Sequence, residues 1–212
     1  MKRGIPLFRR GRIALCVLAM SAVAFAPSTC PAKARSSSDV SQSDATGPTE
    51  NLFLSDYGTH VVAFSSEFGS GWEASNLTPS RADIDPDGSI IRPLIWSSAS
   101  MAPFPHWLLF AFDKPRWVTT LVFDNYLEEE ADHPGISAKD MEIWAGDDPD
   151  TLQKIKTLTL ERNRSGQKVE IAPIQARYIK LVIRTNYGHP WYTELNATGA
   201  FDNGTRPDVA AQ

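Results

Sequence analysis

The chain has 212 residues, of which 42% are hydrophobic and 10% aromatic, and its formal net charge is −4. This apolar content is enough for a packed core and excludes global disorder, and the length predicts one domain. The first 34 residues carry six basic and no acidic residues, whereas the remainder carries 15 basic against 25 acidic residues. An acid-rich body repels phosphate backbones, so we expect no nucleic-acid partner.

Residues 1–34 are predicted to be a signal peptide. A basic stretch that ends at Arg12 precedes an apolar run of 14 residues, Ile13 to Ala26. A membrane span takes about 20 residues, so this run better suits the core of an export signal. Ala-x-Ala cleavage patterns follow at 24–26 and 32–34. We therefore expect an exported protein, periplasmic or extracellular, with a retained membrane anchor as the alternative.

Both cysteines, Cys16 and Cys30, lie within the predicted signal. Its removal leaves no thiol for a disulfide, a nucleophile or a metal site. Cys30 is also a candidate position for a lipid anchor, although Pro27 departs from the usual lipoprotein pattern. The mature domain must then be held by its hydrophobic core alone, which about 150 residues can supply.

The rest of the chain divides into a linker, a domain and a tail. Residues 35–50 are rich in Ser and contain one aliphatic residue besides alanine, so they predict a flexible linker. Residues 203–212 are similarly polar and predict a flexible tail. The candidate domain is therefore 51–202.

Short runs rich in β-branched and aromatic residues fill this domain. The predicted strands are 61–64, 107–112, 117–123, 140–144, 169–171, 177–184 and 193–200. Turn signals such as Lys114-Pro115 separate them, and only 151–156 predicts a helical turn. Trp96, Trp107, Trp117 and Tyr178 are assigned to the core. Many short strands with regular turns predict an all-β, antiparallel β-sandwich of the jelly-roll type.

The order of these segments resembles the discoidin family, also called the coagulation factor V/VIII type C domain. The motifs that carry the resemblance are VVAFSSEFGSGWEASNL, IIRPLIWSS, PHWLLFAFDKPRWVTTLVF, MEIWAGDDPDTLQKI and ARYIKLVIRTNYGHPWYTELNATGAF. Together they cover about residues 58–201. The resemblance implies the galactose-binding-like fold and a function in binding.

The sequence departs from the family pattern in a loop that often holds calcium. After Asn76-Leu77 the family usually has Asp-Gly, whereas this chain has an insert that contains Asp83, Asp85 and Asp87. Their spacing imitates the first half of a calcium loop, but the downstream ligands are missing. Family resemblance adds Glu194 of the final strands as a further ligand. We therefore expect no required cofactor, and consider both a structural calcium ion and a simple polar turn.

The strongest catalytic-looking cluster is the acidic loop from Glu128 to His133. Carboxylates beside a histidine can transfer protons or hold a cation. However, a run of charges in a loop is usually just solvated, and the chain contains no established catalytic motif. A glycan-active enzyme is therefore the less favoured alternative, and we expect a non-catalytic protein.

Family resemblance places the binding site in loops at one end of the sandwich, at 66–72, 80–92 and 126–134, joined by the turn 187–191. Sugar recognition needs aromatic faces and a few hydrogen-bonding groups. The predicted aromatic faces are Trp72, Tyr126 and Tyr187. The predicted hydrogen-bonding residues are Arg92, Asn125, His133 and His189.

The expected partner is a carbohydrate or cell-surface glycan, and the alternative is a protein–protein adhesion or assembly module. Family members also use these loops to enter membranes, and Phe68 is an apolar tip residue of that kind. The neighbouring Glu67 and the acidic third loop would repel anionic lipid, so membrane contact is not expected.

Overall fold

The computed structural model describes residues 50–84 and 94–207. The predicted signal peptide, most of the predicted linker and residues 85–93 lie outside this part of the chain. The strands are β1 (His60–Phe64), β2 (Trp96–Ser97), β3 (His106–Phe123), β4 (Asp140–Gly146), β5 (Gln153–Thr159), β6 (Gln167–Ile183), β7 (Glu194–Leu195) and β8 (Thr198–Phe201). The short 3₁₀ helices are η1 (Ser55–Tyr57), η2 (Ala74–Leu77), η3 (Arg81–Asp83) and η4 (Glu128–Ala131). No helix in these ranges is long and apolar enough to cross a membrane.

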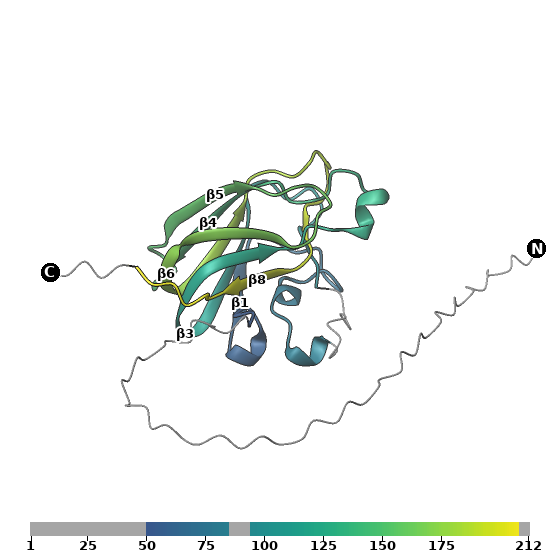
Figure 1. The fold of residues 1–212 in the computed structure, drawn as a ribbon. Coiled ribbons are helices and arrows are strands. Elements are labelled where there is room, and N and C mark those ends of the chain that lie inside the picture. The colour runs from purple at the N-terminus through teal and green to yellow at the C-terminus, as the bar shows by residue number, and fades with distance from the viewer. Residues whose placement is uncertain (1–49, 85–93, 208–212) are drawn as a thin grey trace, which may run out of the picture. The chain divides into compact units, whose positions relative to one another are not determined.

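Two long strands, β3 and β6, organise the larger sheet (Figure 1). They pair antiparallel, from His106 opposite Ile183 to Phe123 opposite Gln167. The sheet has the order β1-β3-β6-β4-β5, and β8 also pairs with β3. Register shifts interrupt the β3–β6 ladder at two places, and irregularities of this kind bend strands. The result is the predicted antiparallel β-sandwich.

Several predicted element boundaries were wrong. The Lys114-Pro115 pair does not end a strand, because Pro115 lies in an exposed, unpaired stretch of β3 where no backbone N–H is required. The predicted strands 169–171 and 177–184 are parts of the single strand β6. The predicted helical turn at 151–156 is instead the start of β5, because β4 offers that segment an edge to pair with. The predicted strand 193–200 is divided into β7 and β8.

Alternation along β3 determines which side chains enter the core. Leu108, Phe110 and Phe112 are buried, and Phe110 stacks on Phe53 with ring centroids 4.2 Å apart. Burial of such a side chain contributes about 1.5–3 kcal/mol. Trp96 is fully buried, as predicted.

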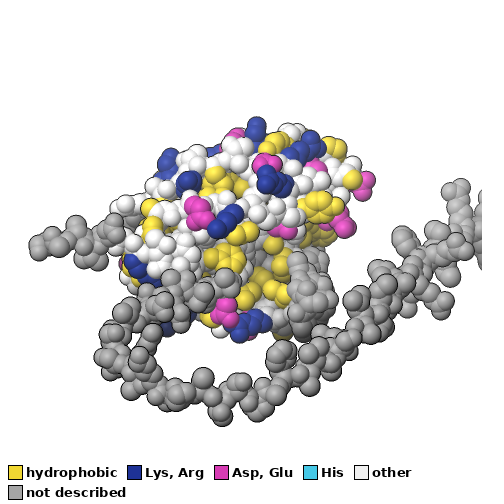
Figure 2. All heavy atoms as spheres, viewed as in Figure 1, with side chains coloured by type: hydrophobic (Ala, Val, Ile, Leu, Met, Phe, Trp, Pro, Cys, Tyr) yellow, Lys and Arg dark blue, Asp and Glu magenta, His cyan; other side chains and the backbone are white. Residues whose placement is uncertain are grey.

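Three aromatic residues assigned to the core are only partly buried. Trp107 lies beneath the Lys180 ammonium at 4.4 Å, and Trp117 lies beneath the Arg206 guanidinium at 4.8 Å. Tyr178 lies beside the Arg177 guanidinium at 5.9 Å. Because neighbouring residues in a strand point to opposite faces, a run of apolar residues places some of them outside. Figure 2 shows basic and acidic side chains interspersed over the face of β4, β5 and β6.

The second, two-stranded sheet joins two loops at one end of the domain. In this sheet Trp96 pairs with Leu195 and Ser97 with Glu194. The Phe68 backbone N–H donates to the Ser97 carbonyl at 2.9 Å, which ties the loop after β1 to β2. The Glu194 N–H donates to the Ile136 carbonyl at 2.9 Å, which ties the loop after η4 to β7.

Gly135 is where the loop after η4 meets the turn around residue 188. Its φ of +89° belongs to the left-handed region, and a Cβ there would lie 2.7 Å from the Tyr187 carbonyl oxygen. The Gly135 carbonyl also accepts the N–H groups of Tyr187 and His189. Only glycine allows this close approach of two backbones.

We expect Gly135→Ala to lower the free energy of unfolding by at least about 2 kcal/mol more than Gly188→Ala, because overpacking adds to backbone strain. Gly188 is the matched control, since it also has positive φ but nothing within 4 Å of a Cβ. Urea denaturation of both variants measures the difference. Equal losses would show that the backbone approach at Gly135 can relax.

Candidate functional site

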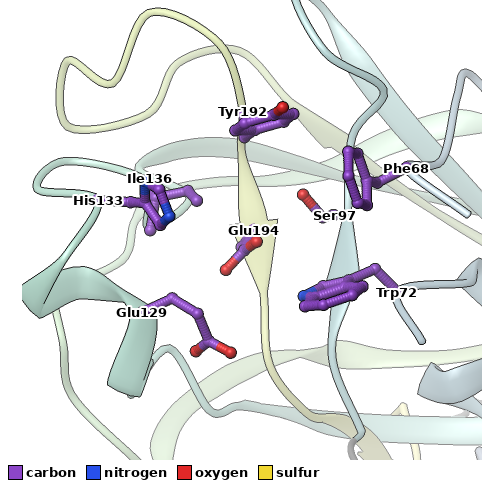
Figure 3. Close-up of a pocket in the computed structure, with 8 residues that line it drawn as sticks. All are labelled: Phe68, Trp72, Ser97, Glu129, His133, Ile136, Tyr192 and Glu194. Carbon is purple, nitrogen blue, oxygen red and sulfur yellow. The ribbon is translucent and has the colours of Figure 1, made fainter. Parts of the chain in front are cut away.

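A pocket of about 260 Å³ opens beside the β2–β7 pair (Figure 3). Its walls come from the loop after β1, from β2, from η4 with its following loop, and from the segment that enters β7. The lining residues are Phe68, Trp72, Ser97, Glu129, His133, Ile136, Tyr192 and Glu194. Segments more than 100 residues apart in the sequence therefore build one concavity.

Three aromatic rings form one side of the pocket. Phe68 is 51% exposed and meets two rings edge to face: Trp72 at 5.6 Å and Tyr192 at 5.3 Å between ring centroids. Trp72 and Tyr192 are partly buried and pack against the small apolar cluster that contains Ile136. The apolar wall is therefore fixed from behind while its rim faces solvent.

Glu194 provides the polar floor of the pocket. Its side chain lies on β7 opposite Ser97, is only 4% exposed, and its Oε2 atom has no hydrogen-bond partner. The Trp72 Nε1 donor is also buried without a partner. Figure 3 shows the carboxylates of Glu194 and Glu129 pointing into the same space. The pocket thus holds one unpaired donor and one unpaired acceptor beside an apolar wall.

Burial raises the pKa of Glu194 to about 7, and the negative charge of Glu129 adds to this effect. A hydrogen bond from Ser97 opposes the rise, and the charge of Glu130 makes a smaller contribution in the same direction as Glu129. Desolvation and like charge both disfavour the ionised form. At neutral pH both the protonated and the ionised state of the Glu194 carboxyl are therefore populated.

Glu130 stabilises the loop that carries Glu129 and His133. Its carboxylate is 6% exposed and accepts hydrogen bonds from the Gly135 N–H at 2.6 Å, the Ser137 N–H at 3.1 Å and the Ser137 hydroxyl at 2.5 Å. It also pairs with the Arg162 guanidinium. Although burial acts to raise it, the pKa of Glu130 is lowered overall by these hydrogen bonds, of which that from Ser137 is the largest. The acidic cluster predicted as one group is therefore divided between loop support and pocket lining.

The structure brings two of the predicted ligand-binding residues into the pocket, Trp72 and His133. His189 lies behind them: its ring is 5.5 Å from that of His133 and 5.8 Å from that of Tyr192, and its Nδ1 accepts the Tyr192 N–H at 3.1 Å. It orients the wall and is not among the residues that line it.

The other predicted ligand-binding residues do not line the pocket. Asn125 is fully buried and its amide N–H groups donate to the carbonyls of Ala138 and Glu161, so in this structure the side chain supports the loop and does not line the pocket. The Tyr187 hydroxyl donates to the Leu160 carbonyl at 2.6 Å, and Tyr126 is 49% exposed outside the pocket. Arg92 lies outside the described residues.

The predicted calcium ligands are only partly described. Asp83 closes a capping box with Ser80 at the start of η3, and Glu194 lies in the pocket. Asp85 and Asp87 lie outside the described residues. Within the ranges that the structure covers, no three His, Cys, Asp or Glu side chains come together as a metal site.

Sequence reasoning missed several pocket residues. Tyr192 and Ser97 were not assigned to the site, and Phe68 was considered only as a membrane-contacting tip. Tyr192 precedes Glu194 by two residues in an alternating segment, which predicts that both face the same side. Ser97 lies opposite Glu194 only because β2 pairs with β7, a long-range pairing that local patterns do not reveal.

The architecture is an antiparallel sandwich with a pocket among the loops at one end. Residues 61–196 match the model of the F5/8 type C domain, and the chain belongs to this family. The discoidin resemblance read from the sequence is thereby confirmed. No curated protein matches the chain in sequence.

Solved structures agree with this fold. A chitosan-binding module from a Paenibacillus sp. IK-5 chitosanase/glucanase has 20% sequence identity and a TM-score of 0.53, covering 72% of this chain and 99% of the module. The family 32 carbohydrate-binding module of Clostridium perfringens NanJ has 16% identity and a TM-score of 0.53, with 72% and 98% coverage. A Bacteroides thetaiotaomicron protein described as a putative chitobiase has 20% identity and a TM-score of 0.54, with 70% and 90% coverage.

The raised pKa of Glu194 predicts how stability depends on pH. Its contribution to stability is fully present below the unfolded pKa of about 4.5 and is lost as the pH rises through about 7. Glu194→Gln removes this loss, so at pH 8 the variant should be more stable than the wild type by up to about 3 kcal/mol, and by much less at pH 5.

Thermal unfolding of both proteins between pH 5 and pH 8 measures this difference. Glu128→Gln is the control, because Glu128 is an exposed carboxylate on the same loop as Glu129. The stability difference between Glu128→Gln and the wild type should stay nearly constant from pH 5 to pH 8. A Glu194→Gln profile parallel to the wild-type profile would contradict the assignment.

Proposed function

We propose that this chain is an exported, non-catalytic carbohydrate-binding protein, and that its ligand occupies the pocket of Phe68, Trp72 and Tyr192. One observation carries the proposal: an aromatic wall stands beside an unpaired buried donor, Trp72 Nε1, and an unpaired buried acceptor, Glu194 Oε2. A sugar presents C–H groups that pack on aromatic rings, and hydroxyls that both accept and donate hydrogen bonds.

The structural comparisons support the proposal. The Paenibacillus module is described as chitosan-binding, and the NanJ module is in complex with galactose. Another Clostridium perfringens module, with 13% identity, 70% and 99% coverage and a TM-score of 0.51, is in complex with GalNAc-β-1,3-galactose. Function follows the site and not the fold alone, so these likenesses raise the expectation of a sugar ligand without identifying the sugar.

The acidic loop gives less support to a glycan-active enzyme. Glu130 is committed to hydrogen bonds within the loop, and Glu128 is exposed and does not line the pocket. Glu129 and His133 line it as groups that can bind a ligand. Domains of this family generally bind and do not catalyse, which agrees with a non-catalytic role.

A structural calcium ion and export through residues 1–34 stay predictions. The first is checked by the effect of a chelator on the melting temperature, and the second by amino-terminal sequencing of the secreted chain.

The test is a glycan array followed by calorimetry of the wild type with the best sugar. Phe68→Ala should weaken binding about tenfold or more, because it removes an exposed ring from the wall, and should barely change the melting temperature. Tyr126→Ala removes a ring of similar exposure outside the pocket and should leave affinity unchanged. Loss of affinity in the Tyr126 variant alone would place the site elsewhere, and a wild type that binds no glycan would refute the proposed function.

A further inference from the structure

Among the described residues, the buried carboxylates have cationic partners with one exception. Glu130 pairs with Arg162, and Glu142 pairs with Arg184 at 2.8 Å and Lys154 at 3.2 Å. No described Lys or Arg forms an ion pair with Glu194, although Glu194 is the least exposed of the three. A buried carboxylate without a cation is costly, and such groups gather where a ligand supplies the missing partner.

The surroundings of Glu194 add negative charge instead of cancelling it. Glu129 from η4 lines the same pocket, and Glu130 lies on the same 3₁₀ helix. Of the described residues that line the pocket none is Lys or Arg, and His133 is the one that can carry a positive charge. The electrostatic complement of this floor is therefore a compact cation with several hydrogen-bond donors.

Resting on the proposed function, we propose that the pocket binds an amino sugar through its free, protonated amine, held between the carboxylates of Glu194 and Glu129. An ammonium group supplies both the charge and the donor that Glu194 Oε2 lacks. The rings of Trp72 and Tyr192 pack on the sugar and favour a nearby cation. An N-acetylated sugar keeps its ring and hydroxyls but has no charge, so the site should discriminate against it.

The experiment compares two probes by calorimetry: the trimer of glucosamine and its fully N-acetylated counterpart. The measurement is made at about pH 6, where most of the sugar's free amine is protonated although its oxygen neighbours weaken it as a base, and the bound ammonium favours the ionised form of Glu194. The wild type should bind the free-amine trimer at least tenfold more tightly. Glu194→Gln and Glu129→Gln should each reduce that preference roughly tenfold or more, because a charge-assisted hydrogen bond becomes a neutral one.

Glu128→Gln is the matched control, because it removes one negative charge from the same loop outside the pocket. It should retain the full preference. If Glu128→Gln lost the preference for the free amine as much as the two pocket variants do, net charge alone would attract the amine and the proposal would be overturned. Urea unfolding of each variant ensures that affinities are compared between folded proteins.

The outcomes also separate this inference from the proposed function. The wild type could bind both trimers equally, or bind neutral sugars such as galactose more tightly, and lose this binding in Phe68→Ala. Either result would overturn recognition of the amine and leave the proposed carbohydrate binding intact. Binding of free lysine as tight as that of the glucosamine trimer would show a cation site without sugar selectivity and overturn the proposal. If calcium chloride displaced the trimer, the carboxylates would be assigned to a metal ion, and this result would also overturn the proposal.

Discussion

The pairing of β2 with β7 is the constraint on which the pocket depends. Each strand has only two residues, yet the pair places Ser97 opposite Glu194 and joins chain segments nearly 100 residues apart. The loops after β1 and after η4 hydrogen-bond to this pair through backbone groups of Phe68 and Glu194. These contacts are made by backbone groups, so they tie the two loops to the strand pair whatever side chains Phe68 and Glu194 carry.

Two neighbouring acids have opposite roles around this pair. The Glu130 carboxylate pairs with Arg162 and accepts hydrogen bonds from Gly135 and Ser137. These contacts fix the shape of the acidic loop. Glu194 is similarly buried but unpaired, and burial raises its pKa. The first arrangement stabilises the fold. The second lowers stability as the pH rises through neutrality, and the proposed amine ligand would supply the charge that Glu194 lacks.

The aromatic wall is built in two layers. Trp72 and Tyr192 rest on the small cluster of Ile95, Leu127 and Ile136, and Phe68 lies on their edges, largely exposed. Packing of this kind restricts the rotamers of the rings, and for a ligand of the proposed kind it would reduce the entropy lost on binding. His189 contributes from behind by accepting the Tyr192 N–H.

The sequence by itself determined the all-β class and the discoidin family, because alternation, turns and ordered motifs are local signals. Through the family resemblance it also predicted a binding site in the loops at one end of the sandwich. Two of the residues predicted for that site, Trp72 and His133, line the pocket. Only the tertiary structure decided that β3 runs through Pro115, that Asn125 is buried, and that Tyr192, Ser97 and Glu129 share a pocket with Glu194. The physical reason is that hydrogen bonds between distant strands set which side chains converge and which charges stay unpaired, and no local pattern in the chain encodes those pairings.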